Sequence, residues 1–279
     1  MRLDLVLPNE GDAALEALNA GAYFEDMGWD GLWVTDHLIG LDAYQPTYGN
    51  YWLEILIAMT HLAATTKRAR IGVGVMVVPY RNAVVTAKQL ATMDVLSGGR
   101  IDLGIGTGWA RREYIAVDKG HIFDQRGPFT DEVLDVMLAC WKGGQVNFEG
   151  KWHNFKKVNF EPTPVRNNRV PIWVGMRQFA PAPMRRAAKY ADVWHPTGVT
   201  PEQVREGGER LDELAGRRIP RSLRIRMEGD PSMLADKLHA YKEAGCMTVV
   251  VNFDQARTFG ELDRCATALY EAAKSLQKD

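Results

Sequence analysis

Short apolar runs alternate with amphipathic helical runs along the whole chain. The short runs are rich in β-branched residues, which predicts buried strands, and the runs between them carry apolar residues at helical spacing. The expected strands are Leu3–Leu7, Gly31–Thr35, Ile71–Val78, Ile101–Ile105, Ile172–Gly175, Asp192–His195, Leu223–Met227 and Thr248–Phe253. The expected helices begin near Ala13, Trp52, Ala83, Pro128, Ala182, Pro201, Ser232 and Gly260. The pattern therefore predicts eight strand and helix pairs.

Eight such pairs predict a parallel (β/α)8 TIM barrel of the α/β class, because closure leaves no open sheet edge. The 279 residues fit one barrel domain spanning 1–279, since barrels of this kind run to roughly 250 residues. A doubly wound open sheet is the alternative, although it rarely needs eight regular repeats.

Two segments interrupt the repeat. Gln145–Arg169 alternates aromatic with polar residues around a Glu149-Gly150 turn and predicts an inserted hairpin. We favour a cap on the barrel over a pocket wall for this hairpin. The loop Leu38–Tyr51 carries Tyr44, Tyr48 and Tyr51, whose rings fit a substrate lid as well as they fit a local packing cluster or a subunit contact.

Composition narrows the function classes. A net charge of −1 gives no electrostatic case for nucleic acid or an anionic membrane. The three cysteines are isolated, and the histidines lack metal-ligand spacing, so we expect neither disulfides nor a metal site. The first residues read as a strand, and no run has the length of a membrane span. These features predict a cytoplasmic protein without a membrane partner.

Candidate chemistry lies where strands end, because β/α barrels place their sites there. Asp36-His37 follows the second strand and is the best acid/base candidate, since histidine titrates near neutrality and a carboxylate can orient it. The structural alternative is that Asp36 caps a loop and His37 is an ordinary polar residue.

Glycines mark two further strand ends. Gly104, Gly106 and Gly108 lack the spacing of a dinucleotide fingerprint, but backbone without Cβ atoms gives a flat ring room to approach. Gly175-Met176-Arg177 precedes an expected helix. Its backbone N–H groups and the arginine could bind a phosphate. An ordinary helix start with an arginine on the surface explains the same residues equally well.

The chain resembles the luciferase-like monooxygenase superfamily, and within it most closely the deazaflavin branch that uses coenzyme F-420. The resemblance covers most of residues 1–200. It is carried by VTDHL at 34–38, VGVMVVPYRNAVVTAKQLATMDVLSGGRIDLGIGTGW at 73–109, FDQRG at 123–127, FEGKWHNF at 148–155, VPIWVGM at 170–176 and AAKYADVW at 187–194.

The resemblance implies roles for individual residues. It implies that His37, next to Asp36, gives or takes a proton beside the flavin ring. It implies a non-prolyl cis peptide near Val75-Met76 against the ring face. The coenzyme residues that it implies are Val75, Met76, Gly106, Thr107 and Gly108 around the ring, and Gly175, Met176 and Arg177 at the phosphate. Trp109 stands where sugar-phosphate dehydrogenases of the branch have an acidic residue, which argues against a sugar-phosphate substrate.

The expected function is an oxidoreductase that transfers a hydride between coenzyme F-420 and a small organic substrate. A two-component monooxygenase using FMN and oxygen is the first alternative, and a non-catalytic flavin-binding barrel is the second. An aldolase is disfavoured because no expected strand ends in lysine. The resemblance also implies a homodimer.

Overall fold

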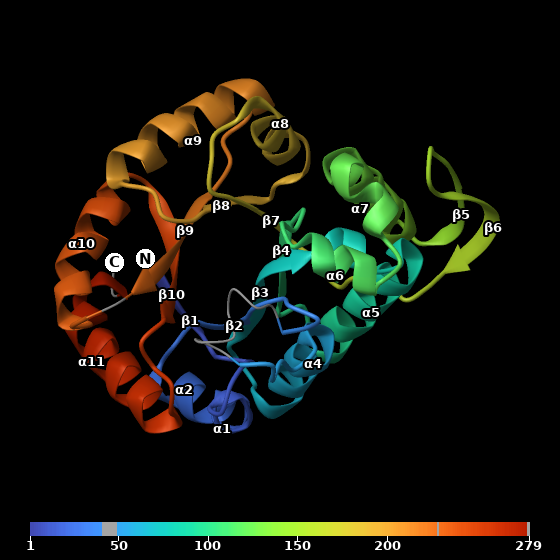
Figure 1. Ribbon diagram of the computed structural model, residues 1–279. Coiled ribbons are helices and arrows are strands. Elements are labelled where there is room, and N and C mark those ends of the chain that lie inside the picture. The colour runs from blue at the N-terminus through green and yellow to red at the C-terminus, as the bar shows by residue number, and fades with distance from the viewer. Residues whose placement is uncertain (41–48, 228, 278–279) are drawn as a thin grey trace.

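The computed structural model describes residues 1–40, 49–227 and 229–277 and forms a closed parallel barrel. Figure 1 looks along the barrel axis and shows the strands as an inner ring surrounded by helices. The ring order is β1-β10-β9-β8-β7-β4-β3-β2. Its strands are β1 (Arg2–Val6), β2 (Gly31–Val34), β3 (Arg70–Val77), β4 (Ile101–Gly106), β7 (Ile172–Met176), β8 (Val193–Pro196), β9 (Arg221–Met227) and β10 (Cys246–Phe253). The predicted (β/α)8 barrel is confirmed.

The helical layer follows the predicted order with additions at the first and fourth positions. The one helix expected near Ala13 is two short helices that meet at Ala20, whose backbone (φ −84°, ψ 9°) departs from helical values. A short helix and a 3-10 turn also precede the helix expected near Pro128. The helices are α1 (Ala14–Asn19), α2 (Gly21–Met27), α4 (Ile55–Thr65), η1 (Val78–Tyr80), α5 (Ala83–Leu96), α6 (Arg111–Ala116), η2 (Gly120–Gln125), α7 (Arg126–Trp141), α8 (Pro181–Tyr190), α9 (Pro201–Ala215), α10 (Ser232–Glu243) and α11 (Phe259–Gln277).

Local sequence signals explain where several helices begin. The Asn82 side chain accepts hydrogen bonds from the amides of Val84 and Val85 at the start of α5. At the start of α9, Thr200 and Gln203 form a capping box, and Pro201 occupies the first turn. Such caps satisfy amide groups that have no partner inside the helix. They fix the direction in which each helix leaves its strand.

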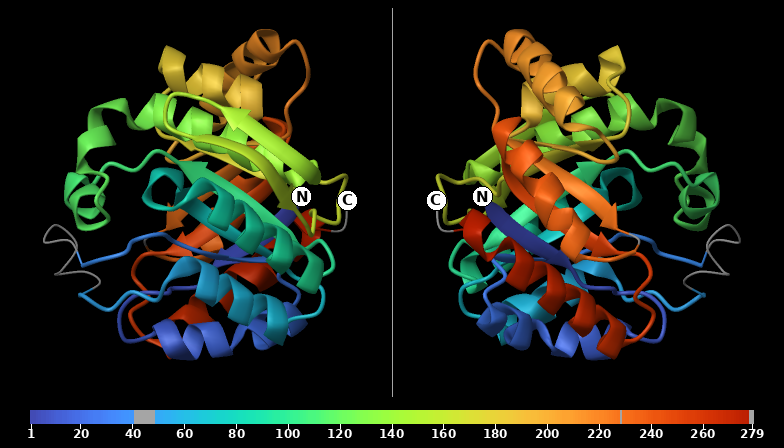
Figure 2. Two further views of the ribbon diagram at one scale, coloured as in Figure 1. Left: turned by 90° about the vertical axis from the view of Figure 1, so that its right-hand side faces the viewer. Right: turned by 90° about the vertical axis from the view of Figure 1, so that its left-hand side faces the viewer.

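The amino-terminal end of the barrel is filled by buried side chains. Trp33 and Trp173 pack edge to face with ring centroids 4.9 Å apart, and the Trp33 indole donates to the Asp4 carboxylate at 2.7 Å. Arg2 bridges Asp4 and Asp102 at the same level. Figure 2 shows the amino terminus on the side of the barrel away from α6. With this end plugged, a pocket can form only toward the carboxyl ends of the strands.

The predicted hairpin is present but does not cap the barrel. Strands β5 (Gly144–Glu149) and β6 (Asn154–Phe160) lie outside α7 in Figure 1. The Glu132 carboxylate of α7 holds the hairpin tip by accepting the amides of Lys151, Trp152 and His153. The cap prediction is therefore wrong, because the aromatic side of the hairpin packs on the helical layer. None of the hairpin's residues lines the central pocket.

Within the described residues, no helix is both long and apolar enough to cross a membrane.

Candidate active site

A pocket of about 410 Å³ opens at the carboxyl ends of the barrel strands. This volume lies in the range that holds small-molecule ligands. Eight of the ten predicted site residues line it: Asp36, His37, Val75, Thr107, Gly108, Gly175, Met176 and Arg177. Met76 instead points into the hydrophobic core, and Gly106 lies against Val75 outside the lining.

His37 is held at the pocket wall by an acidic residue and two indoles. Its Nδ1 lies 3.0 Å from a carboxylate oxygen of Glu113. The rings of Trp52 and Trp109 flank the imidazole, with centroids 4.8 and 6.2 Å away. Both indoles meet the imidazole edge to face, at interplanar angles of 65° and 74°.

Glu113 is a site residue that sequence reasoning missed. Its carboxylate is buried and also accepts hydrogen bonds from the Leu38 amide at 2.7 Å and the Tyr80 hydroxyl at 3.0 Å. Burial alone would raise the pKa of Glu113, but the bonds from His37, Leu38 and Tyr80 lower it below its ordinary value. Glu113 is therefore ionised near neutral pH and can only accept, so Nδ1 of His37 carries the hydrogen. Its only sequence signal is a place in the short helix after the Gly106–Trp109 strand end.

Asp36 has a different role from the expected one. Both of its oxygens accept from the Arg81 guanidinium, at 2.6 and 2.9 Å, and one accepts the Val77 amide at 2.7 Å. Burial raises the pKa of Asp36, and the charge of Arg81 offsets part of that rise. The carboxylate therefore fastens the end of β3 to the β2 loop. The residue that orients His37 is Glu113, which corrects the hypothesis that Asp36 does so.

The strand-end glycines make room for valine side chains. A Cβ on Gly106 would lie 2.6 Å from one Val75 methyl, and a Cβ on Gly175 would lie 2.6 Å from the other. Gly108 has a φ of 69°, and a Cβ there would meet the Val77 side chain at 2.5 Å. The clearance that we expected for a flat ring at Gly106 is thus taken up by Val75, which itself lines the pocket, and Val75 also fills the space at Gly175.

A non-prolyl cis peptide lies in β3, as the resemblance implied, but one residue earlier. The cis bond joins Gly74 to Val75, not Val75 to Met76.

His195 lies at the floor of the pocket, at the end of β8. It is 2% exposed, and its ring stacks on Trp33 at a centroid distance of 5.4 Å. Burial, helped by the charges of Arg224 and Arg2, lowers the pKa of His195 to about 3. The imidazole is therefore neutral at physiological pH.

Charged groups from the segment after β1 and from β9 complete the lining. Glu10 is 9% exposed, and burial raises its pKa against the opposing effect of the Asn9 amide and Arg224. Arg224 donates to the Gly74 carbonyl, and Arg226 pairs with Asp254 at 2.5 Å. Sequence reasoning missed Arg224 and Arg226 because a charged side chain in a strand does not reveal which end of the barrel it faces, and missed Glu10 because it lies in the segment after a strand.

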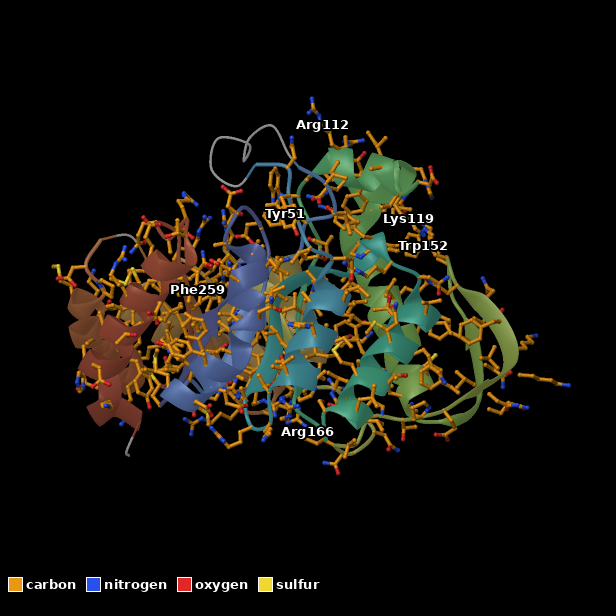
Figure 3. All side chains as sticks on the ribbon, turned by 90° about the horizontal axis from the view of Figure 1, so that it is seen from below. Tyr51, Arg112, Lys119, Trp152, Arg166 and Phe259 are labelled. Carbon is orange, nitrogen blue, oxygen red and sulfur yellow. The ribbon has the colours of Figure 1, made fainter. Side chains whose placement is uncertain are left out.

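The structure describes only part of the long loop between β2 and α4. Tyr44 and Tyr48 lie outside the described residues. Tyr51 is 52% exposed, and the adjacent Trp52 lines the pocket. Figure 3 shows Tyr51 and Arg112 at one end of the barrel and Arg166 at the opposite end. The choice between a lid and a packing cluster stays open for this loop.

No set of three or more His, Cys, Asp or Glu side chains could hold a metal ion in the part of the chain that the structure describes.

Comparison with known proteins places this site in a family. The sequence model described as "Luciferase-like monooxygenase" matches residues 1–227. The chain belongs to the luciferase-like monooxygenase family.

The luciferase-like relatives include proteins named for coenzyme F-420. The chain is 30% identical over 195 residues to the F420-dependent glucose-6-phosphate dehydrogenase of Microbacterium testaceum. The aligned stretch covers 68% of this chain and 55% of the dehydrogenase. It is 29% identical over 216 residues to the uncharacterized protein Rv0940c of Mycobacterium tuberculosis, covering 76% of this chain and 72% of that protein.

Solved luciferase-like structures share the barrel. An F420-dependent secondary alcohol dehydrogenase superposes with a TM-score of 0.80 at 17% identity, covering 98% of each chain. The oxygenating constituent of 3,6-diketocamphane monooxygenase from Pseudomonas putida, solved with FMN, superposes with a TM-score of 0.75 at 14% identity over 97% and 96% of the two chains. At these identities the likeness concerns the fold.

Proposed function

We propose that this luciferase-like protein is an oxidoreductase that transfers a hydride between coenzyme F-420 and a small organic substrate. The observation that carries the proposal is the His37–Glu113 pair on the wall of a single pocket that also holds most of the residues expected around a deazaflavin. The F420-dependent dehydrogenase among the relatives supports this coenzyme.

The pocket residues fit a planar, anionic coenzyme. Val75 and Thr107 would contact the ring, and Arg177 after β7 would bind the phosphate, since a guanidinium pairs well with phosphate oxygens. The buried Nε2 of His195 has no hydrogen-bond partner within the described residues, so the floor offers an acceptor to a ligand. When bound, the coenzyme supplies or receives a hydride at its central ring.

The proton accompanying that hydride would be handled by His37. Since Nδ1 holds its hydrogen on the Glu113 carboxylate, Nε2 is the nitrogen that takes a proton from a substrate hydroxyl or returns it to a carbonyl oxygen. The Glu113 charge stabilises the imidazolium that forms. The ring contacts with Trp52 and Trp109 would help to hold the imidazole in place during this step.

A two-component FMN-dependent monooxygenase is the second candidate. It is favoured by a sequence relative, the oxygenase component of the flavin-dependent trigonelline monooxygenase of Acinetobacter baylyi, to which the chain is 32% identical over 116 residues. A flavin-binding barrel without catalytic activity is the third. It predicts coenzyme binding without turnover, and His37→Ala would leave every measured activity unchanged.

A spectral titration with F-420 and FMN tests the proposal. We expect F-420 to bind more tightly than FMN and to be reduced or oxidised with a cognate substrate. We expect His37→Ala to bind F-420 but to lose turnover, whereas His121→Ala, at an exposed position, keeps it. Tight FMN binding with no F-420 binding would favour the monooxygenase.

The homodimer and the cytoplasmic location also remain proposals. Light scattering on the purified protein tests the first, and fractionation of the source cells tests the second.

A further inference from the structure

The protonation state of His195 follows from its hydrogen bonds. Nδ1 of His195 lies 2.8 Å from the Ser222 hydroxyl oxygen, and that hydroxyl donates to the Trp194 carbonyl at 2.9 Å. A hydroxyl has one hydrogen to donate, so toward His195 its oxygen must accept. Nδ1 therefore carries the imidazole hydrogen, and Nε2 presents a lone pair.

The direction of this lone pair is fixed by packing. Trp33 stacks on the imidazole, and Trp173 meets it edge to face with centroids 5.6 Å apart. Nε2 lies 3.7 Å from the point where a Cβ of Gly74 would stand, and the Arg224 Cδ lies 3.9 Å from the same point. The absence of a side chain on Gly74 thus leaves a small space that Nε2 and the Arg224 side chain both border, and the Arg224 charge is close enough to lower the pKa of His195.

The lone pair lacks a partner within the described residues, although the His195 side chain is buried. A buried polar atom without a hydrogen bond costs free energy, and such an atom at a pocket floor is a candidate ligand contact. The lowered pKa of His195 keeps the acceptor available throughout the physiological pH range.

We propose that Nε2 of His195 accepts the imide N–H of the coenzyme's pyrimidine ring, while Arg224 donates to a carbonyl beside that N–H. The inference rests on the proposed function, since it needs a flavin or a deazaflavin. Both coenzymes carry this imide, in which an N–H stands between two carbonyls. The imide edge presents a donor next to an acceptor, so it can pair with Nε2 and with the Arg224 guanidinium together. A ligand hydroxyl would need only the acceptor, so it would fit this pair of residues less well.

The test combines an altered coenzyme with selective labelling of histidine by ¹⁵N. The probes are whichever of F-420 and FMN the wild-type protein binds, and its 3-methyl derivative, which lacks the imide hydrogen. The His195→Phe variant assigns the resonances and removes the acceptor. His239→Phe, at an exposed position on α10, is the matched control.

We expect the free protein to show His195 protonated at Nδ1 only, with an Nε2 resonance that shifts when the coenzyme is added. The 3-methyl derivative should bind roughly tenfold more weakly and leave that resonance in place. His195→Phe should weaken coenzyme binding by roughly the same factor and abolish the discrimination between the two probes. His239→Phe should bind both as the wild type does.

Several outcomes would overturn the inference while the proposed function stands. They are a hydrogen on Nε2 in the free protein, equal wild-type binding of both probes, or an Nε2 shift that appears only when substrate is added. If His195→Phe does not fold, the wild-type comparison of the two probes still decides. If the wild type binds neither F-420 nor FMN, the proposed function itself fails, and the inference fails with it.

Discussion

The Glu113 carboxylate lies 3.0 Å from Nδ1 of His37, although the two residues are 76 positions apart in the chain. Glu113 comes from α6 after β4, and His37 follows β2, so β3 separates their strands in the ring. The pair therefore depends on the closed barrel, which brings the carboxyl ends of all its strands to one face.

Replacing Glu113 by glutamine tests the role of this pair. The amide keeps the size of the side chain but loses the charge that stabilises a protonated His37. We expect Glu113→Gln to lower kcat/KM by about 10²-fold, the lower range for a proton-transfer group. Coenzyme affinity measured by titration should change little.

Tyr80→Phe is the matched control, because the Tyr80 hydroxyl donates to the same carboxylate and its removal leaves the Glu113 charge in place. We expect a much smaller decrease in kcat/KM for this variant. Equal losses in both variants would mean that Glu113 acts through the local packing and not through His37.

The fold and half of the proton-handling pair were predictable from sequence. Strand periodicity is local, so the barrel could be derived, and His37 could be found because it directly follows a strand. Glu113 could not be found in this way, because its pairing with His37 exists only after the barrel closes. His195 ends an expected strand, but its role as an acceptor depends on Ser222 in the next strand, which the sequence does not reveal.

Asp36 shows why adjacency in sequence misleads. Successive residues at a strand end point in different directions. The Asp36 side chain reaches Arg81, whereas that of His37 reaches Glu113.

The Asp36–Arg81 contact predicts a stability effect. Its partners are almost fully buried, with side-chain exposures of 0% and 11%. Asp36→Ala leaves a buried guanidinium without this partner and should lower the free energy of unfolding by roughly 3–5 kcal/mol. Urea unfolding of Asp36→Ala, Arg81→Ala and the double variant measures the coupling between the two residues. The stability loss of the double variant should be clearly smaller than the sum of the two single losses. Additive losses would contradict the ion pair.

Gly106 and Val75 predict a pair of compensating substitutions. A Cβ on Gly106 meets only the Val75 side chain, at 2.6 and 3.7 Å. Gly106→Ala should therefore cost about 1–3 kcal/mol of stability and weaken coenzyme binding by displacing Val75. Adding Val75→Ala should recover most of the stability, as measured by thermal unfolding. No recovery in the double variant would show that the glycine is needed for another reason.

Arg177 predicts selectivity for the coenzyme's phosphate. We expect Arg177→Gln to weaken binding of FMN roughly tenfold while riboflavin, which lacks the phosphate, binds as it does to the wild type. Fluorescence titration with both compounds measures this difference. If both affinities fall equally, Arg177 contacts the ring or shapes the pocket instead.

Glu25 predicts a pH-dependent stability far from the pocket. Its buried carboxylate accepts the amides of Lys67, Arg68 and Ala69 at 2.6 to 3.0 Å, just before β3. Burial would raise the pKa of Glu25, but these three amides lower it below its ordinary value of 4.5. A carboxyl with a lowered folded-state pKa stabilises the protein above its unfolded-state pKa, and this contribution disappears as the pH falls through the folded-state value.

Glu25→Gln should therefore reduce the free energy of unfolding by about 2 kcal/mol at pH 7. The difference from the wild type should shrink once the pH falls below 4.5, the ordinary value for this group. Urea unfolding at a series of pH values measures it. Asp26→Asn is the matched control, since Asp26 is 78% exposed and its contact with Arg68 spans 3.5 Å. Exposed pairs of this kind contribute little, so that variant should match the wild type at every pH. A Glu25→Gln deficit that stays constant down to pH 3 would show that shape, and not the carboxylate charge, is what the three amides require.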